Sequence, residues 1–199
     1  MNITLYGPKQ GSAMRVFWAM EELGQAYEHK NIDMRAGEHK GPEYLGINPV
    51  GQVPAASFDG LVMAESLAIN RYACEKFNPA LLGSTPEFRA KGMQWELFVM
   101  FNVQNNLSVL AGPKWGMPFN AEADAKARER LQKNLPVLDQ YLSSAEYLAG
   151  GKFTIADINA GAAFEYAGFA EYDLTTYANI SRWLTALRTR PSYLKVTTA

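Results

Sequence analysis

Residues 48–55 read Asn-Pro-Val-Gly-Gln-Val-Pro-Ala, and this stretch enters an apolar strand through Pro54. Proline has no main-chain N–H, so it cannot donate a ladder hydrogen bond where the strand begins. If the Val53–Pro54 bond is cis, the main-chain N–H and C=O of Val53 point into a groove, free to pair with an extended peptide as an added strand would. A turn before an ordinary edge strand is the alternative that these residues alone leave open.

The segments around this stretch predict an α/β domain. Asp59-Gly60 lies between two short apolar runs and favours a tight hairpin turn, because both residues tolerate positive φ. The order βαβ, a short helix and then ββα is typical of a thioredoxin-like domain with a mixed sheet. The predicted elements, in chain order, are a strand at 3–6, a helix at 13–23, a strand at 26–32, a short helix at 42–45, strands at 54–58 and 61–63, and a helix at 65–77.

The second half of the chain predicts helices alone. Two breaker-rich segments, Asn78-Pro79 and residues 83–86, separate the halves, and strand patterns stop after them. We therefore expect a thioredoxin-like domain over residues 1–78, a linker over 79–86 and an all-α domain over 87–199.

Three patterns describe the expected helical domain. Residues 87–110 predict a long helix rich in Met, Trp and Phe. Residues 131–142 carry leucines at helical spacing, and Pro136 is expected to kink or restart that helix. Thr154, with Asp157 three residues later, predicts a capped helix start to which we assign a structural role only.

The composition excludes several classes of protein. The 199 residues hold 19 basic and 20 acidic side chains, a net charge of -1, so no basic surface for nucleic acid or anionic membrane is expected. The sequence contains neither an apolar run long enough to span a bilayer nor a recognisable secretory leader. We therefore expect a cytoplasmic protein that acts on a small molecule.

Cysteine and histidine are too few for disulfide or metal chemistry. Because Cys74 is the single cysteine, the sequence excludes an internal disulfide. We expect Cys74 to be a core residue on the third helix. Two histidines make no zinc cluster, so we expect no metal. Phosphate-cradling glycine motifs are also missing from the sequence.

Two further positions could hold anions. Glu65-Ser66 begins a helix, whose free N–H groups and dipole favour a carboxylate, and His39-Lys40 offers cationic donors for a second one. Each has a plainer alternative, a helix cap in the first case and a solvated lysine in the second. Together with Val53, they favour a short extended peptide that is charged at each end.

At these residues the sequence resembles the glutathione transferase family, most closely its phi class. Residues 38–45, 48–55 and 65–66 follow the glutathione-site motifs of that family in order and spacing. The likeness covers about residues 1–77, and the helical half matches more loosely, through its capping box and general helix pattern. It implies the cytosolic glutathione transferase architecture, an α/β thioredoxin-like N-terminal domain followed by an all-α C-terminal domain.

The resemblance also implies an activity. Glutathione would be the co-substrate, and its ionised thiol would add to an electrophilic apolar compound, a detoxification reaction carried out by a two-fold homodimer. Glutathione-dependent reduction of peroxides or disulfides, and a non-catalytic glutathione-binding scaffold, stay open as alternatives. The implied glutathione contacts are Gln52 and Val53, next to Pro54, for the tripeptide backbone, Glu65 and Ser66 for the γ-glutamyl end, and His39 and Lys40 for the glycyl carboxylate.

Catalysis requires a group that stabilises the thiolate. Lowering a thiol pKa of about 8.5 by about two units needs ~2.7 kcal/mol. A hydroxyl hydrogen bond to a charged sulfur contributes roughly 1.5 to 3 kcal/mol, and a helix N-terminus adds roughly 0.3 to 1. One serine at the start of the first helix would therefore suffice, and Ser12 is the predicted catalytic residue.

The loop before Ser12 departs from the phi pattern, because it is one residue shorter. Counting forward from Tyr6 puts Gly11 in the serine position, whereas counting back from Arg15 puts Gln10 there. Tyr6, at the end of the first strand, and a main-chain amide are the other candidates for thiolate stabilisation.

Several aromatic residues at helical spacing are either core residues or the lining of a pocket for the second substrate. They are Trp95, Phe98, Phe101, Trp115, Tyr166 and Phe169.

Overall fold

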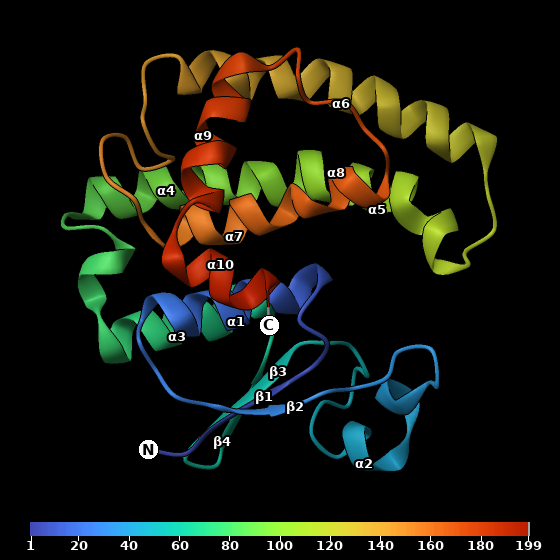
Figure 1. Ribbon diagram of the computed structural model, residues 1–199, viewed down its shortest axis with the longest axis vertical. Helices are drawn as coiled ribbons and strands as arrows, with labels where there is room; N and C mark the ends of the chain where they lie inside the picture. The colour runs from blue at the N-terminus through green and yellow to red at the C-terminus, as the bar shows by residue number, and fades with distance from the viewer. Residues whose placement is uncertain (199) are drawn as a thin grey trace. The chain divides into compact units, whose positions relative to one another are not determined.

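The structure is a computed structural model that describes residues 1–198. The chain forms two compact units: Met1–Pro79 together with the segment that starts at Arg190, and Ala80–Thr189. The first unit holds a sheet with helices, and the second holds helices (Figure 1). The fold is therefore a thioredoxin-like α/β domain with an all-helical domain, as predicted.

The sheet of the first unit is mixed, with strand order β2-β1-β3-β4. Its strands are β1 (Ile3–Tyr6), β2 (Glu28–Lys30), β3 (Ala55–Phe58) and β4 (Leu61–Ala64). β1 pairs in parallel with β2 and antiparallel with β3, and β3 pairs antiparallel with β4. β2 is shorter than the predicted strand at 26–32, because it pairs only with β1 and the pairing ends at Tyr6↔Lys30, where β1 itself ends.

The hairpin between β3 and β4 has the predicted two-residue turn. Phe58 lies opposite Leu61, which leaves Asp59 and Gly60 as the loop. Their φ angles of 50° and 93° are both positive, as a primed hairpin turn requires. The dipeptide was therefore a sufficient signal for the register of this strand pair.

Helix α1 (Gly11–Glu22) is buried all round along Ala13–Met20, because β1, α3 (Ser66–Phe77) and α10 (Pro191–Thr197) all pack against it. The nearly continuous apolar composition of this segment is that of a helix surrounded by neighbours rather than of one facing solvent. A 3-10 turn (Glu38–Lys40) and the short helix α2 (Pro42–Leu45) follow β2. Figure 1 shows α2 away from the α1 and α3 side of the sheet.

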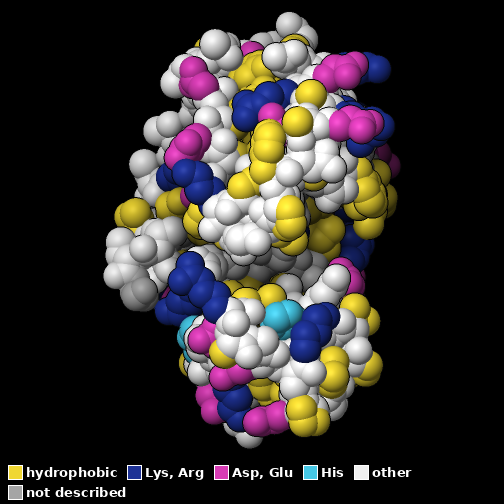
Figure 2. Space-filling view, turned by 90° about the vertical axis from the view of Figure 1, so that its right-hand side faces the viewer, with side chains coloured by type: hydrophobic (Ala, Val, Ile, Leu, Met, Phe, Trp, Pro, Cys, Tyr) yellow, Lys and Arg dark blue, Asp and Glu magenta, His cyan; other side chains and the backbone are white. Residues whose placement is uncertain are grey.

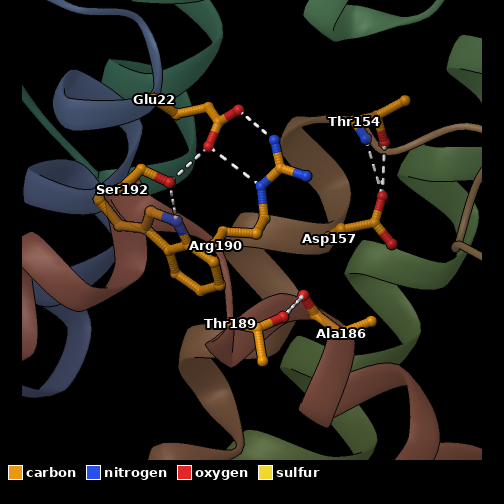
Figure 3. Close-up of polar contacts among 8 residues, drawn as sticks. Glu22, Thr154, Asp157, Ala186, Thr189, Arg190 and Ser192 are labelled. Carbon is orange, nitrogen blue, oxygen red and sulfur yellow. Dashed lines mark hydrogen bonds and ion pairs between the residues drawn. The ribbon is translucent and has the colours of Figure 1, made fainter.

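α10 is fastened to α1 by a polar network (Figure 3). The Glu22 carboxylate accepts hydrogen bonds from the Arg190 guanidinium and from the Ser192 hydroxyl. Ser192 Oγ in turn accepts from Trp18 Nε1 at 3.1 Å. The expected helical domain ran to residue 199, whereas by contact α10 lies in the first unit.

The second unit is built from helices and their connecting loops, with an isolated β-bridge between Tyr147 and Gly150. The helices are α4 (Pro86–Val99), a π-helical turn (Met100–Gln104), α5 (Asn105–Ala111), a 3-10 turn (Gly112–Trp115), α6 (Ala121–Leu142), α7 (Ile155–Ala163), α8 (Glu165–Phe169) and α9 (Ala178–Arg188), and a 3-10 turn (Pro79–Leu82) precedes them.

Two helices of this unit differ from their predictions. The helix expected at 87–110 is interrupted by the π-helical turn. In this turn side-chain amides donate hydrogen bonds to main-chain carbonyls: Asn102 Nδ2 donates to Phe98 O, and Asn106 Nδ2 donates to Asn102 O. α6 continues through Pro136 without restarting. Its leucines are buried along one face, and this burial outweighs the hydrogen bond that the proline lacks.

The helix start at Thr154 is confirmed. α7 begins at Ile155 with Thr154 as its N-cap, and Asp157 Oδ2 accepts a hydrogen bond from Thr154 N at 2.9 Å (Figure 3). Within residues 1–198, none of the helices has the length and apolar character needed to cross a membrane.

Candidate functional site

The loop at 48–54 packs against the segment that carries His39 and Lys40. Gly51 has a φ of +62°, and a Cβ there would lie 2.7 Å from the His39 carbonyl oxygen, so only glycine fits. Lys40 Nζ donates to Gly51 O at 2.8 Å. The motif at 38–45 and the motif at 48–55 therefore form one structural unit.

Gln52 is positioned through its main chain. Its carbonyl oxygen accepts from Tyr44 Oη at 2.7 Å and from Asn48 Nδ2 at 2.8 Å. Burial raises the pKa of Tyr44, so its hydroxyl remains a donor. The Gln52 side chain is exposed and can meet a ligand, because the hydrogen bonds that fix this residue use only its main chain.

Val53 follows directly, and the Val53–Pro54 peptide bond is cis, as the pairing hypothesis requires. In the described part of the chain, the hydrogen bonds of this loop involve the neighbours of Val53, and its own N–H and C=O take part in none of them. β3 begins only at Ala55. An extended peptide could therefore pair with Val53 without displacing a bond of the sheet.

Glu65 and Ser66 lie at the N-terminus of α3. Glu65 has a φ of +65° and is exposed, and its side chain makes no capping hydrogen bond within residues 1–198. Glu65 is thus the N-cap residue by position, as the plainer reading has it, but without a side-chain hydrogen bond to the helix. Ser66 is buried, and its Oγ accepts from Arg15 Nη1 at 3.3 Å.

His39 has one ring nitrogen that is not used for hydrogen bonding within residues 1–198. Its Nδ1 is buried and meets no hydrogen-bond partner among the described residues. Lys40 keeps part of its donor capacity, because its ammonium has three hydrogens and uses two carbonyls, those of Gly51 and Val50. Both side chains are compatible with a carboxylate ligand.

Ser12 lies in the first turn of α1, as its second residue. The N-cap is Gln10, so Ser12 is not the cap that the plainer reading assigned to it. Gly11 has a φ of +58°, a conformation that disfavours serine, which argues against position 11 as a site for the hydroxyl. Ser12 thus occupies the helix end, where main-chain N–H groups are unsatisfied and the dipole favours an anion.

Tyr6 has a different environment. It lines a cavity of about 550 Å³ between β2 and α2, together with Lys30, Tyr44 and Ile47. Lys30 Nζ lies 6.0 Å from the centre of the Tyr6 ring, on the strand next to it. Ser12, Val53 and Ser66 are not among the residues that line this cavity in the part of the chain described. The two hydroxyl candidates therefore occupy separate places.

Three residues that shape this region were not predicted from sequence: Arg15, Tyr44 and Asn48. Arg15 could have been found, because it is the one charged residue within the buried run Ala13–Met20. Tyr44 and Asn48 lie inside recognised motifs, but their shared acceptor, the Gln52 carbonyl, is a main-chain atom that carries no signal in the sequence.

The structure separates the aromatic candidates of the helical unit into groups. Trp95 is buried and stacks on Tyr141 with ring centres 4.2 Å apart, which makes it a core residue. Trp115 instead contacts Tyr166 and Phe169, with ring centres 5.4 and 5.6 Å away. Hydrophobic side chains are visible at the surface among basic and acidic ones on the face in Figure 2. Trp115 and Phe169 are 44% and 38% exposed, whereas Tyr166 is buried, so two of these three rings are accessible.

Comparison with known proteins agrees with the fold and the motifs. Residues 1–75 match the family model for the glutathione S-transferase N-terminal domain, and residues 88–191 match the model for the glutathione S-transferase C-terminal domain. Among curated proteins, glutathione S-transferase F9 of Arabidopsis thaliana is 31% identical over 205 residues, which cover 97% of this chain and 95% of that protein.

Solved structures extend the likeness to three dimensions. A glutathione S-transferase-I structure with the ligand lactoylglutathione has a TM-score of 0.88 and 31% identity, and covers 100% of this chain and 99% of that one. Glutathione S-transferase I from maize, in complex with an atrazine–glutathione conjugate, has a TM-score of 0.86 and 31% identity, covering 100% of this chain and 97% of that one. With both domains matched in order, the chain belongs to the glutathione S-transferase family.

Proposed function

We propose that this protein binds glutathione in its first unit, ionises the thiol beside Ser12 and adds it to an apolar electrophile. The observation that carries the proposal is the close approach of three segments at Gly7. A Cβ at Gly7 would lie 3.2 Å from Ala13 Cβ and 3.3 Å from Val53 Cβ. The residue after Ser12 and the residue before Pro54 therefore border the same small space.

The proposed contacts divide glutathione into three parts. Val53 pairs with the cysteinyl main chain, in the manner of an added strand. The γ-glutamyl carboxylate lies at the α3 N-terminus, where Ser66 donates and the helix dipole is favourable. The glycyl carboxylate meets His39 and Lys40, whose segment is tied to Gly51. Gln52 completes the grip through its exposed side chain.

The second substrate is proposed to be an aromatic or otherwise apolar electrophile. The exposed rings of Trp115 and Phe169, which lie beside the buried Tyr166, support this choice, because aromatic faces bind flat apolar compounds. The maize relative was solved with an atrazine–glutathione conjugate, which supports the same substrate class. Since the reaction needs only a thiolate and an electrophile, the proposal includes no metal.

Ser12→Ala is the test of the mechanism. We expect kcat for an aryl halide to fall about 10- to 150-fold, because one hydrogen bond to an ionised sulfur contributes roughly 1.5 to 3 kcal/mol. The pKa of the bound thiol, read from the pH dependence of kcat/KM, should rise toward about 8.5. Stopped-flow absorbance of bound thiolate would measure this pKa directly.

Tyr6→Phe is the matched control, since it also removes one hydroxyl near the end of β1. We expect its kcat to stay within about twofold of the wild-type value, because Tyr6 lines the separate cavity. If Tyr6→Phe rather than Ser12→Ala abolished turnover, Tyr6 would replace Ser12 in the mechanism. Equal turnover in the wild type and both variants would indicate that main-chain amides stabilise the thiolate.

The same assays separate conjugation from its alternatives. Reduction of hydroperoxides or disulfides without aryl conjugation would favour the glutathione-dependent reductase. Retention on immobilised glutathione without turnover on any substrate would favour a scaffold.

We further propose a homodimer that works in the cytoplasm in detoxification. An exposed apolar stripe on the helical unit supports the dimer: Met93, Leu97 and Phe101 follow one another at four-residue intervals. The cytoplasmic assignment is supported by Cys74, a buried cysteine that forms no disulfide among the described residues. Fractionation of cells that make the tagged chain would contradict it if the protein were found in the secreted fraction.

A further inference from the structure

Arg15 is a buried cation in the helix that carries Ser12. Its exposed fraction is 2%, in a run whose other members are apolar. Burying a guanidinium costs several kcal/mol unless polar partners or an anion compensate for the lost water. A buried charge in this helix therefore depends on the polar groups around it.

Both ends of Arg15 are tied to one face of α3. Its Nη1 donates to Ser66 Oγ at 3.3 Å, and its main-chain carbonyl accepts from Asn70 Nδ2 at 3.0 Å. Ser66 and Asn70 are four residues apart and so lie one above the other on α3. The Nη1 contact holds the guanidinium at the N-terminal end of α3, whereas Asn70 contacts only the main chain of α1.

This contact decides which way the Ser66 hydroxyl points its hydrogen. A serine hydroxyl has one hydrogen to donate and two lone pairs that accept. Because the guanidinium N–H occupies a lone pair, and because a cation repels the hydroxyl hydrogen, that hydrogen points away from Arg15. Ser66 is then a donor for an anion, and the buried positive charge and the α3 dipole attract the same anion.

From this geometry we infer that Arg15 is a positioning residue that makes the site selective for a free α-carboxylate at the γ-glutamyl end of the thiol peptide. The inference rests on the proposed function and deepens it. Arg15 acts through Ser66, and its charge has no role in the binding of the cysteinyl or glycyl parts. A peptide that lacks the γ-glutamyl carboxylate gains nothing from it.

The experiment compares two ligands: glutathione and γ-aminobutyryl-cysteinyl-glycine, which differs by loss of that carboxylate. Calorimetry would give both dissociation constants for the wild type and for Arg15→Leu, Arg15→Lys and Asn70→Ala. We expect the wild type to bind glutathione at least about tenfold more tightly than the analogue. Arg15→Leu should lose about tenfold for glutathione and less than about twofold for the analogue.

Asn70→Ala is the structural control. It removes the main-chain tie between α1 and α3 without touching the guanidinium, so we expect a lower Tm with the ratio of the two dissociation constants unchanged. Arg15→Lys should keep part of the wild-type ratio of the two dissociation constants, since lysine has the charge of arginine but not its planar geometry. If Arg15→Leu does not fold, as judged by circular dichroism, the ratio in Arg15→Lys decides: a value equal to that of the wild type overturns the requirement for the guanidinium.

Two results would overturn the inference: an equal loss for both ligands in Arg15→Leu, or a change of ratio in Asn70→Ala as large as in Arg15→Leu. A wild type that binds both ligands equally also overturns it and leaves the glutathione site standing. A wild type that binds neither ligand instead overturns the proposed function.

Discussion

Gly51 joins two parts of the proposed glutathione site. Its positive φ and the nearby His39 carbonyl leave room for a hydrogen atom only, because a Cβ would lie 2.7 Å from that oxygen. The loop at 48–54 can therefore approach the 3-10 turn at 38–40 closely enough for Lys40 to reach the Gly51 carbonyl.

Gly51→Ala is predicted to weaken glutathione binding and to lower stability. The positive φ alone costs alanine about 1 to 3 kcal/mol, and the contact with His39 adds to that cost by displacing the loop. Urea denaturation and calorimetry with glutathione would measure the two effects.

Gly24→Ala is the matched control, because its φ of +64° is nearly the same and nothing lies within 4 Å of the added Cβ. It should show the conformational cost alone, with glutathione affinity retained. Equal losses of affinity in both variants would contradict the role of the His39 contact.

Residues of the site differ in how readily sequence shows them. Val53, Pro54, Glu65 and Ser66 belong to short motifs whose main-chain or helix-end chemistry is local, so the sequence predicted where they lie in the fold. Arg15 meets Ser66 across 51 residues, and that contact depends on how α1 and α3 pack. The side-chain partners of Ser12 also could not be predicted from the sequence, because the fold around a shortened loop determines its surroundings.

At the scale of elements, the start of α7 depends on one buried carboxylate. Asp157 Oδ1 accepts from Leu148 N and Trp183 Nε1, and Oδ2 accepts from Thr154 N and Oγ1. Burial raises the pKa of Asp157 to about 6, although these hydrogen bonds favour the charged form. The group is therefore ionised at neutral pH and joins α7, α9 and the loop before them.

This raised pKa predicts an unusual pH dependence for Asp157→Asn. The unfolded carboxyl titrates near 3.8 and the folded one near 6, so the folded state binds the proton more tightly. The contribution of Asp157 to the free energy of unfolding is then largest below about pH 4 and falls as pH rises to 6, by on the order of 3 kcal/mol.

Urea denaturation of the wild type and Asp157→Asn at pH 4.5 and pH 7 would check this prediction, and the deficit of the variant should be larger at pH 4.5. Asp173→Asn is a suitable control, because main-chain hydrogen bonds from Thr175 lower the pKa of that exposed carboxyl. A deficit of Asp157→Asn that grows with pH would contradict the assigned direction.

Element boundaries were less predictable than element types. The hairpin at Asp59-Gly60 and the helix start at Thr154 followed from local chemistry and were confirmed. The π-helical turn at Met100–Gln104 was missed, because its asparagine contacts compete with a helical pattern that is otherwise regular. Pro136 was expected to disturb α6, but the buried leucines on either side keep the helix continuous.

At the scale of the whole molecule, the exposed stripe of Met93, Leu97 and Phe101 predicts self-association. Leu97→Glu places a charge in the middle of the stripe, so we expect the proposed dimer to dissociate, with the mass from light scattering halved at micromolar concentration. Val137→Glu is the control, since Val137 is 49% exposed on α6 and outside the stripe. If Leu97→Glu remained dimeric, the interface would lie outside the stripe.

The attachment of α10 to α1 has a consequence for synthesis on the ribosome. The first unit cannot complete its packing around Trp18 until α10 has emerged, and the whole helical unit is translated before that point. Until then, a nascent chain presents the apolar flank of α1 that Tyr193 later covers. That flank is covered when Arg190 and Ser192 reach Glu22.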